Sequence, residues 1–398
     1  MTRVLTPLIT PLKVVDLFSG CGGMSAGFRA HADCFEIIGA VDLEVAKPSS
    51  NRRKTFSTKC NATYYRNIGL KPKNADIRTL NPKDYRIELG LKQSELDVLI
   101  ACPPCTGLSQ KNSKNHLQGD SRNSLIDRVA DFVEEFLPDF LVMENVKEIL
   151  KGRNTHHFEY LKKCLRGLGY SLHAELHQFS DYGLPQRRKR ALIIARRCQG
   201  LISPKVLEKS KKCTVWDAIG DMPRIDAGET DSSDPMHVSP GMTTKVLLRI
   251  QSIPKNGGSW GDIMANPDIP QEQKQKLLIP SMFRARPGSF PDVYGRLKWH
   301  DVAATITREC GHVGNGRYTH PEQDRLLTVR EMSLLQGFPK NYYFEGSLSS
   351  KYNQIGDAVP PYISKKIAQH IVSLKLGQVP SQDASCKTVA KQLSLIRG

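Results

Sequence analysis

Long apolar runs are missing from this 398-residue sequence, and their absence excludes one class of protein. A helix that crosses a bilayer needs about 18 or more consecutive apolar residues, and the chain has no such run. The N-terminus also lacks a charged segment followed by an apolar one, so we expect neither a membrane protein nor a secreted one. The length is sufficient for one large domain or two ordinary ones, and no internal repeat is present.

The cysteines do not form a recognisable metal-binding pattern. Ten are present, but only Cys102 and Cys105 form a Cys-x-x-Cys pair, and the others stand singly. A zinc site needs further ligands at compatible spacing, so we expect no metal. Unpaired cysteines fit a reducing compartment, and we expect a cytoplasmic protein. A redox pair, or a buried structural thiol at Cys102, remains an alternative interpretation of the same motif.

Acidic residues are in the minority. The chain has 57 Lys and Arg against 40 Asp and Glu, a formal net charge of +17 and a pI near 9.4. Between Arg187 and Lys212 ten basic residues face one acid, Glu208. Such a surplus indicates a polyanionic partner, although charge alone does not separate DNA from RNA or from an anionic membrane surface.

A glycine-rich loop near the N-terminus indicates a nucleotide-like cofactor. Residues 13–18 predict a strand, and glycines at 20, 22 and 23 then let the backbone turn tightly beside a ligand. The last glycine of a dinucleotide fingerprint is absent because Ser25 stands there, which argues against a pyrophosphate. A second predicted strand, 37–41, ends in Asp42. An acid at this place typically accepts ribose hydroxyls, but a simple turn residue is an equal interpretation.

The apolar run at 96–101 ends abruptly at Cys102-Pro103-Pro104-Cys105. It predicts a buried strand, because proline cannot continue a hydrogen-bonded ladder. Cys105 then lies at the carboxyl end of the strand, the edge where α/β sheets bind ligands, and is a candidate nucleophile. The polar segment 110–123 is either a loop that closes over a substrate or a plain solvated loop.

The next segments continue an alternation of helix and strand. Apolar residues on one helical face predict a helix at 121–137, and a strand at 140–143 follows with Glu144 at its carboxyl end. A right-handed crossover places this strand beside the one that precedes Cys105. A helix at 155–168 and a strand at 191–195 come next.

From about residue 200 this alternation gives way to Pro-, Gly- and Ser-rich sequence. Thr328 and Glu331 predict a capping box on a helix that ends at Gly337, and a C-terminal helix runs to about residue 375. The predicted domains are residues 1–199, a smaller irregular domain at 200–320, a return to the first domain at 321–376, and a disordered tail at 377–398.

Six motifs, in this order, resemble those of the DNA (cytosine-5) methyltransferase family and span residues 13–375. They are Asp16-Leu-Phe-Ser-Gly-Cys-Gly-Gly23, Pro103-Pro-Cys-Thr-Gly-Leu-Ser109, Glu144-Asn-Val146, Gln186-Arg-Arg-Lys-Arg190, Arg330-Glu331 with Leu335-Gln-Gly-Phe-Pro339, and Gly356-Asp-Ala-Val-Pro360. Two positions depart from the family. Asp357 stands where members commonly have Asn, and Thr106 stands where many have Gln.

The resemblance implies an α/β, Rossmann-like S-adenosylmethionine-dependent methyltransferase fold, with a mixed, mostly parallel sheet, helices on both faces and a smaller target-recognition domain. It implies methyl transfer to C5 of a cytosine flipped out of a specific duplex DNA sequence. Cys105 would bond to C6, Glu144 would act at N3 as a carboxyl group kept near neutral by burial, and Arg188 and Arg190 would hold the base carbonyl and a phosphate. The implied cofactor residues are Phe18, Gly20, Gly22, Gly23, Asp42, Asp76, Ile77, Pro104, Ala358 and Val359, and the implied DNA contacts are Ser109, Gln186, Arg187, Thr305 and Thr307.

Other functions remain as alternatives. These are an RNA cytosine-5 methyltransferase, a DNA-binding relative without activity, and a disulfide oxidoreductase built on Cys102 and Cys105. We expect a stand-alone monomer of prokaryotic type that acts on double-stranded DNA, with a restriction endonuclease as a separate partner.

Overall fold

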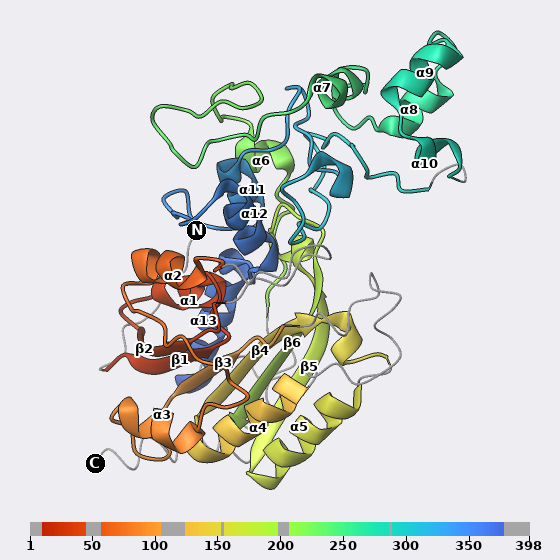
Figure 1. Cartoon of the computed structure of the whole chain (residues 1–398). Coiled ribbons are helices and arrows are strands. Elements are labelled where there is room, and N and C mark those ends of the chain that lie inside the picture. The colour runs from red at the N-terminus through yellow and green to blue at the C-terminus, as the bar shows by residue number, and fades with distance from the viewer. Residues whose placement is uncertain are drawn as a thin grey trace.

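The computed structural model describes residues 10–44, 57–104, 124–152, 155–197, 207–285 and 289–377. Its centre is a six-stranded sheet in the order β2-β1-β3-β4-β6-β5 (Figure 1). β2, β1, β3 and β4 are parallel, whereas β6 is antiparallel to both of its neighbours. The predicted mixed, mostly parallel sheet is therefore confirmed. The strands are β1 (Leu12–Leu17), β2 (Phe35–Val41), β3 (Val98–Ala101), β4 (Phe140–Val146), β5 (Tyr170–Gln178) and β6 (Lys189–Arg197).

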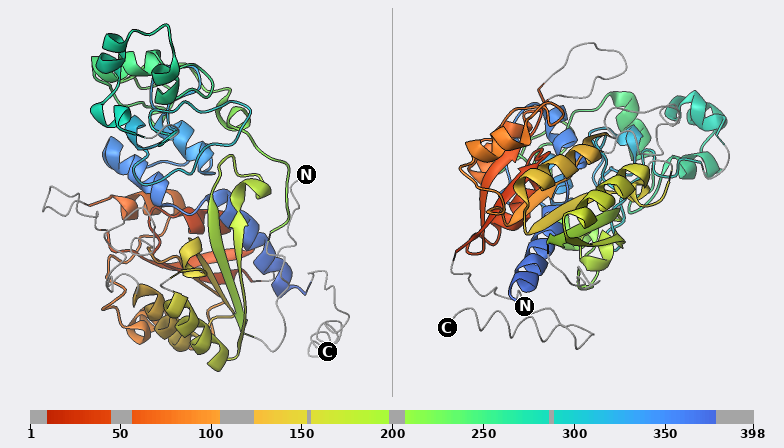
Figure 2. Two further views of the ribbon diagram at one scale, coloured as in Figure 1. Left: turned by 90° about the vertical axis from the view of Figure 1, so that its right-hand side faces the viewer. Right: turned by 90° about the horizontal axis from the view of Figure 1, so that it is seen from below.

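Helices cover both faces of the sheet, so its central strands carry apolar side chains on both faces. Val14, Ile100 and Val142 pack on the face covered by α1 (Gly23–Arg29) and α13 (Pro361–Lys375). Their neighbours Val15 and Leu99 pack on the opposite face, because successive side chains of a strand alternate. That face carries α3 (Pro82–Glu88), α4 (Ser124–Phe136) and α5 (Thr155–Gly167). Figure 2 shows α13 on the side of the sheet opposite to α4 and α5.

The sequence prediction misplaces several strand ends by a few residues and misses one strand. β4 continues to Val146 instead of ending at Met143, because β6 pairs with it as far as Arg190. β3 pairs with β4 only as far as Val142, so Glu144 lies where one neighbouring strand has ended and the other continues. β5 is missing from the prediction, although residues 170–178 alternate between apolar and polar side chains as a strand with one buried face does.

Residues 215–327, between β6 and α11, form a second lobe beyond one end of the sheet (Figure 1). It contains only short helices: α6 (Val215–Ile219), α7 (Thr244–Gln251), α8 (Trp260–Ala265), α9 (Gln271–Leu277) and α10 (Pro280–Phe283). The described residues also contain three short 3-10 helices. They are Lys147–Ile149 after β4, Phe179–Tyr182 after β5, and Val313–Asn315 in the second lobe.

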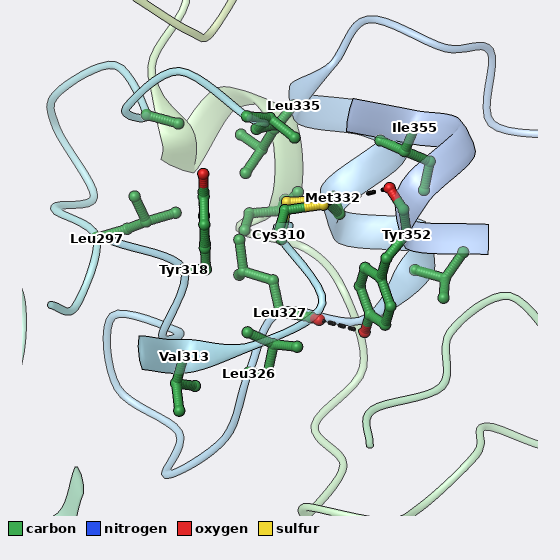
Figure 3. Packing of buried hydrophobic residues seen from close by; sticks show 14 of the residues in the cluster. Leu297, Cys310, Val313, Tyr318, Leu326, Leu327, Met332, Leu335, Tyr352 and Ile355 are labelled. Carbon is green, nitrogen blue, oxygen red and sulfur yellow. Dashed lines mark hydrogen bonds between the residues drawn. The ribbon is translucent and has the colours of Figure 1, made fainter. Parts of the chain in front are cut away.

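The second lobe shares its hydrophobic core with the helices that follow it, α11 (Val329–Leu335) and α12 (Leu348–Asp357), and with α2 (Cys60–Ile68). In Figure 3, Cys310 and Leu327 lie against Tyr352 of α12. The Tyr352 hydroxyl donates to the Leu327 carbonyl at 2.7 Å, and the Cys310 thiol donates to the Tyr352 carbonyl at 3.4 Å. The core thus crosses residue 320, where the sequence predicts a domain boundary.

The helix α11 begins as predicted, with Thr328 and Glu331 forming a capping box. In the part of the chain that the structure describes, no helix is both long enough and apolar enough to cross a membrane. The predicted tail after Gly377 lies outside the described residues.

Candidate active site

The glycine-rich loop leaves β1 through backbone conformations that few residues adopt. Phe18 has φ 62°, Gly20 has φ 52° and Gly22 has φ 90°. Positive φ costs a residue with a Cβ about 1 kcal/mol or more, so the left-handed Phe18 is a strained position of the kind that collects at ligand sites.

The three glycines of this loop serve different purposes. A Cβ on Gly20 would have no heavy atom of the described residues within 4 Å, so this position faces open space. A Cβ on Gly22 would lie 2.8 Å from the Tyr342 hydroxyl, and one on Gly23 would lie 2.3 Å from the Val359 carbonyl oxygen. Only Gly20 therefore leaves room for a ligand on its Cα, whereas Gly22 and Gly23 allow protein to pack closely.

Asp42 at the end of β2 is connected directly to this loop. The Gly20 N–H donates to Asp42 Oδ2 at 3.0 Å. Burial raises the pKa of Asp42 to about 6, although the Gly20 hydrogen bond acts in the opposite direction. Leu43 follows Asp42 and is 43% exposed, a large apolar side chain at this strand end that the sequence analysis did not single out.

A buried polar network lies behind the loop, and the sequence analysis did not predict it either. The Ser25 hydroxyl donates to Asp16 Oδ2 at 2.5 Å and shares a 2.7 Å hydrogen bond with the Tyr64 hydroxyl. Burial raises the pKa of Asp16 to about 7, with the Ser25 hydrogen bond opposing the shift. Ser25, the residue that breaks the dinucleotide fingerprint, therefore anchors an acid of β1.

Asp76 and Ile77 precede the central strand, as the sequence predicts, but their side chains have local partners. The Arg78 guanidinium contacts both carboxylate oxygens of Asp76, and this hydrogen-bonded pair holds the pKa of Asp76 below its usual value. Ile77 is buried, and its carbonyl accepts from Arg128 at 3.2 Å.

Ala358 and Val359 join α12 to α13 and pack on the glycine-rich loop through Gly23. Both are largely buried, and the Ala358 carbonyl accepts from Arg188 at 3.1 Å and from Gln336 at 2.8 Å. Asp357, which stands where members of the family commonly have Asn, forms an ion pair with Arg308.

The segment after β3 is described as far as Pro104, which is exposed. Cys105, Thr106 and Ser109 lie outside the described residues, so the roles predicted for them remain predictions. The Glu144 N–H donates to Cys102 Sγ at 3.4 Å, and the Asn145 amide donates to the Pro103 carbonyl at 3.4 Å. The predicted neighbourhood of these two segments is confirmed by the pairing of β3 with β4.

Glu144, Arg188 and Arg190 meet on one face of the sheet. Alternation places Glu144 on the face of Val142, and the arginines on the face of Leu192, which pairs with Glu144. Glu144 Oε1 lies 3.2 Å from Arg190 Nε and 3.9 Å from Arg188 Nε. This oxygen is buried and has no hydrogen-bond partner among the described residues. Buried acceptors rarely lack a hydrogen bond, and here the two guanidinium groups give this oxygen only ion-pair contacts.

Gln186 and Arg188, just before β6, hydrogen-bond to residues of the second lobe. Gln186 is fully buried; its Oε1 accepts from the Ile306 N–H at 2.9 Å and its Nε2 donates to Gln336 Oε1 at 2.6 Å. Arg188 is also buried and donates to the Ile306 carbonyl at 3.1 Å. The Gln186 side chain therefore contacts protein on both sides. Its predicted contact with DNA stays a prediction, and the burial of the side chain argues against it.

Of the other predicted DNA contacts, the three that the structure describes lie together beside this segment. Arg187 is exposed, and its carbonyl accepts from the Thr305 hydroxyl. Thr307 shares a 3.1 Å hydrogen bond with the Tyr318 hydroxyl. Residues more than a hundred positions apart in the sequence are therefore neighbours here. Among the described residues, no cluster of three or more His, Cys, Asp or Glu is arranged to hold a metal ion.

Comparisons with known proteins identify the family of the chain. The family described as C-5 cytosine-specific DNA methylase matches residues 12–373. The chain is 32% identical to the type II methylase M.HgiDII of Herpetosiphon aurantiacus, over 90% of this chain and 94% of that protein. It is 29% identical to the type II methyltransferase M1.HphI of Haemophilus parahaemolyticus, over 92% of this chain and 88% of that protein.

Solved structures share the fold. A protein described as a DNA modification methyltransferase encoded within a prophage (E. coli) superposes with a TM-score of 0.63 at 23% identity, over 92% of this chain and 99% of that one. Entamoeba histolytica methyltransferase EhMeth gives a TM-score of 0.58 at 14% identity, with 92% and 99% covered. Because the family model matches residues 12–373 and a relative is 32% identical over 90% of the chain, this chain belongs to the C-5 cytosine-specific DNA methylase family.

Proposed function

We propose that this protein transfers a methyl group from S-adenosylmethionine to C5 of a cytosine extruded from a specific sequence of duplex DNA, and that Cys105 bonds transiently to C6. The observation that carries the proposal is the cluster of Glu144, Arg188 and Arg190 beside the Cys102-Pro103 segment. Arg188 also connects this cluster to both of its neighbours, because it donates to Ala358 on the cofactor side and to Ile306 on the side of the second lobe.

The residues around the glycine-rich loop fit the methyl donor. Gly20 faces open space, so a ligand can approach its backbone closely. Asp42 uses Oδ2 for the loop and leaves Oδ1 for the ribose hydroxyls, while the exposed Leu43 offers an apolar surface to adenine. Bound S-adenosylmethionine would supply an electrophilic methyl group on a sulfonium. Asp16 and Asp42 nearby suit a cationic ligand better than a pyrophosphate.

The chemistry explains why a thiol and a carboxyl group are needed together. C5 of cytosine is a weak nucleophile, and addition of the Cys105 thiolate to C6 turns the ring into an enamine that is reactive at C5. Glu144 would hold a proton at N3 during this addition, and its buried Oε1 has no other hydrogen-bond partner among the described residues. After transfer a base removes the C5 proton, and the Cys105 sulfur leaves C6.

The extrusion of the base explains the second lobe. C6 is inaccessible within a duplex, and taking a base out of the stack costs a few kcal/mol. Arg187, Thr305 and Thr307 lie where the second lobe meets β6, and we assign to them contacts with the DNA backbone, with Gln186 holding their segment in place. As part of this proposal the enzyme acts as a cytoplasmic monomer, with any paired endonuclease a separate protein.

Cys105→Ser tests the proposal directly. We expect loss of labelled methyl transfer to duplex DNA with nearly unchanged donor affinity, whereas Cys164→Ser, on α5 away from the site, keeps activity. A duplex with 5-fluorocytosine should trap the wild type covalently in the presence of donor, because its C5 carries no removable proton. Transfer to RNA instead of DNA would support the RNA alternative. Transfer to neither, without trapping, would refute the enzyme assignment.

A further inference from the structure

Phe290 is the most exposed large apolar side chain among the described residues. It is 72% exposed and lies in the second lobe, between α10 and the 3-10 helix at Val313–Asn315. A single exposed apolar side chain is ordinary on a protein surface, so its exposure alone assigns no function. The backbone of this residue supplies a second, independent observation.

The backbone holds Phe290 in a conformation that this residue type does not favour. Its φ is 49°, in the left-handed region that residues with a Cβ rarely adopt. Pro291 follows, and the residue before a proline normally adopts an extended conformation. In the same turn Tyr294 also has a positive φ, 54°. Such conformations persist only where the surrounding structure enforces them, and they collect at ligand sites.

Contacts on both sides of the residue enforce this conformation. The Phe290 carbonyl accepts from Trp260 Nε1 at 3.0 Å, and Trp260 is itself buried. Arg317 donates to the Pro291 carbonyl at 2.8 Å and forms an ion pair with Asp292 at 2.9 Å. The backbone is therefore fixed while the ring of Phe290 stays in solvent. A ring that is held in place before a partner arrives loses little conformational entropy on contact.

The turn of Phe290 borders a cavity between the second lobe and the start of β6. The cavity has a volume of about 440 Å³, and its lining includes Arg187, Thr305, Pro291 and Asp292. Because Arg187 and Thr305 are assigned above to the DNA backbone, a duplex held by them lies beside the turn that presents Phe290.

The same cavity begins close to the proposed position of the extruded base. Arg187 directly precedes Arg188, whose Nε lies 3.9 Å from Glu144 Oε1. A cytosine that reaches Glu144 therefore leaves its gap in the duplex on the side of the cavity that Phe290 borders.

The gap left by an extruded cytosine favours an aromatic ring. The bases beside the gap lose a stacking partner, and this loss is part of the energy that extrusion requires. Phenylalanine is among the apolar side chains that DNA-binding proteins insert between bases. An aromatic ring stacks on any base, so this contact requires no particular neighbouring base.

We propose that Phe290 stacks on the base pair beside the extruded cytosine and stabilises the extruded state. The inference rests on the proposed function, and it adds a contact with bases to the contacts assigned there to the DNA backbone. Phe290 belongs to none of the six sequence motifs. Its exposure, its enforced left-handed backbone and the cavity beside it identify it only in combination.

The test uses a duplex with the sequence that the wild type methylates, found by sequencing DNA that it has methylated. In the probe duplex 2-aminopurine replaces the target cytosine, because its fluorescence rises when it leaves the base stack. At saturating protein, Phe290→Ala should shift the extrusion equilibrium about tenfold toward the stacked state, the loss expected for one stacked base. The single-turnover methylation rate should fall on a paired target and less on a mismatched one, where extrusion costs less.

Three further variants make the comparison specific to the ring. Phe290→Gly also lacks the ring but adopts the left-handed backbone without strain, so it should match the fluorescence of Phe290→Ala and unfold at a higher temperature. Phe290→Tyr keeps the ring and should behave as the wild type. Ile87→Ala is the matched control, because it removes an apolar side chain that is 57% exposed on α3, outside the second lobe.

The outcomes separate this inference from the function on which it rests. If the wild type methylates DNA but Phe290→Ala and Phe290→Gly give wild-type fluorescence at saturation, the ring does not support extrusion and the inference is overturned. An equal loss of rate on paired and mismatched targets would also overturn it, because the ring would then act on a step other than extrusion. Absence of methylation by the wild type would instead refute the proposed function.

Discussion

Gln186→Leu distinguishes a side chain that positions the second lobe from one that reads DNA. Leucine has a similar volume but forms no hydrogen bonds. The substitution leaves the Ile306 N–H and Gln336 Oε1 buried without their present partners, which lie 2.9 Å and 2.6 Å from the Gln186 amide. A buried polar group without a partner costs about 1–3 kcal/mol, so the free energy of unfolding should fall by about 2–5 kcal/mol.

Urea unfolding followed by tryptophan fluorescence measures this loss, and DNA affinity is measured on the same samples. Gln93→Leu provides the control, because Gln93 is exposed and makes one long hydrogen bond, 3.4 Å, to the Glu134 carbonyl. The control should change the free energy of unfolding by less than about 0.5 kcal/mol. If Gln186→Leu kept wild-type stability and lost only DNA affinity, Gln186 would be a direct DNA contact and the positioning role would be wrong.

Two further predictions concern buried acids. Because burial raises the pKa of Asp16 from 3.8 to about 7, the folded protein holds a proton between those values that the unfolded chain has released, and the free energy of unfolding falls as pH rises through this window. Asp16→Asn should therefore stabilise the protein by about 2–4 kcal/mol at pH 8 and not at all near pH 4; equal gains at both pH values in urea unfolding would contradict this. Glu331→Gln breaks a fully buried pair with Arg325, 2.7 Å apart, and should lower the free energy of unfolding by about 3–5 kcal/mol; a melting temperature equal to the wild type would count against it.

The order of the motifs predicts the fold well, because strands and the loops at their ends are local features of the sequence. The strand before Cys102 and the helices at 124–136 and 155–167 agree with the apolar patterns. β4 was predicted too short because its last residues are polar, and only pairing with β6 keeps them in the sheet. That pairing is a tertiary contact, which a pattern within one segment does not contain.

Contacts between distant segments set the limit of sequence reasoning for the site. The hydrogen bond from Gly20 to Asp42 agrees with the spacing expected for a cofactor loop. By contrast, nothing in the sequence distinguishes Gln186, which is buried against Ile306, from the adjoining Arg187, which is exposed. Neighbouring residues of an extended segment point to opposite sides, but which side meets the second lobe depends on where that lobe packs.

Ser25 shows how a missing feature of the sequence gains a physical meaning in the structure. In the sequence, the lack of a glycine at position 25 argues only against a pyrophosphate. The structure shows what the serine contributes, since its hydroxyl contacts both Asp16 and Tyr64 within the interior. A glycine at this position would leave Asp16 buried without that donor, and burial already raises the pKa of this acid to about 7. The residue that breaks the dinucleotide pattern thus also stabilises the ionised form of Asp16 behind the loop, where a ligand with a positive charge is proposed to bind.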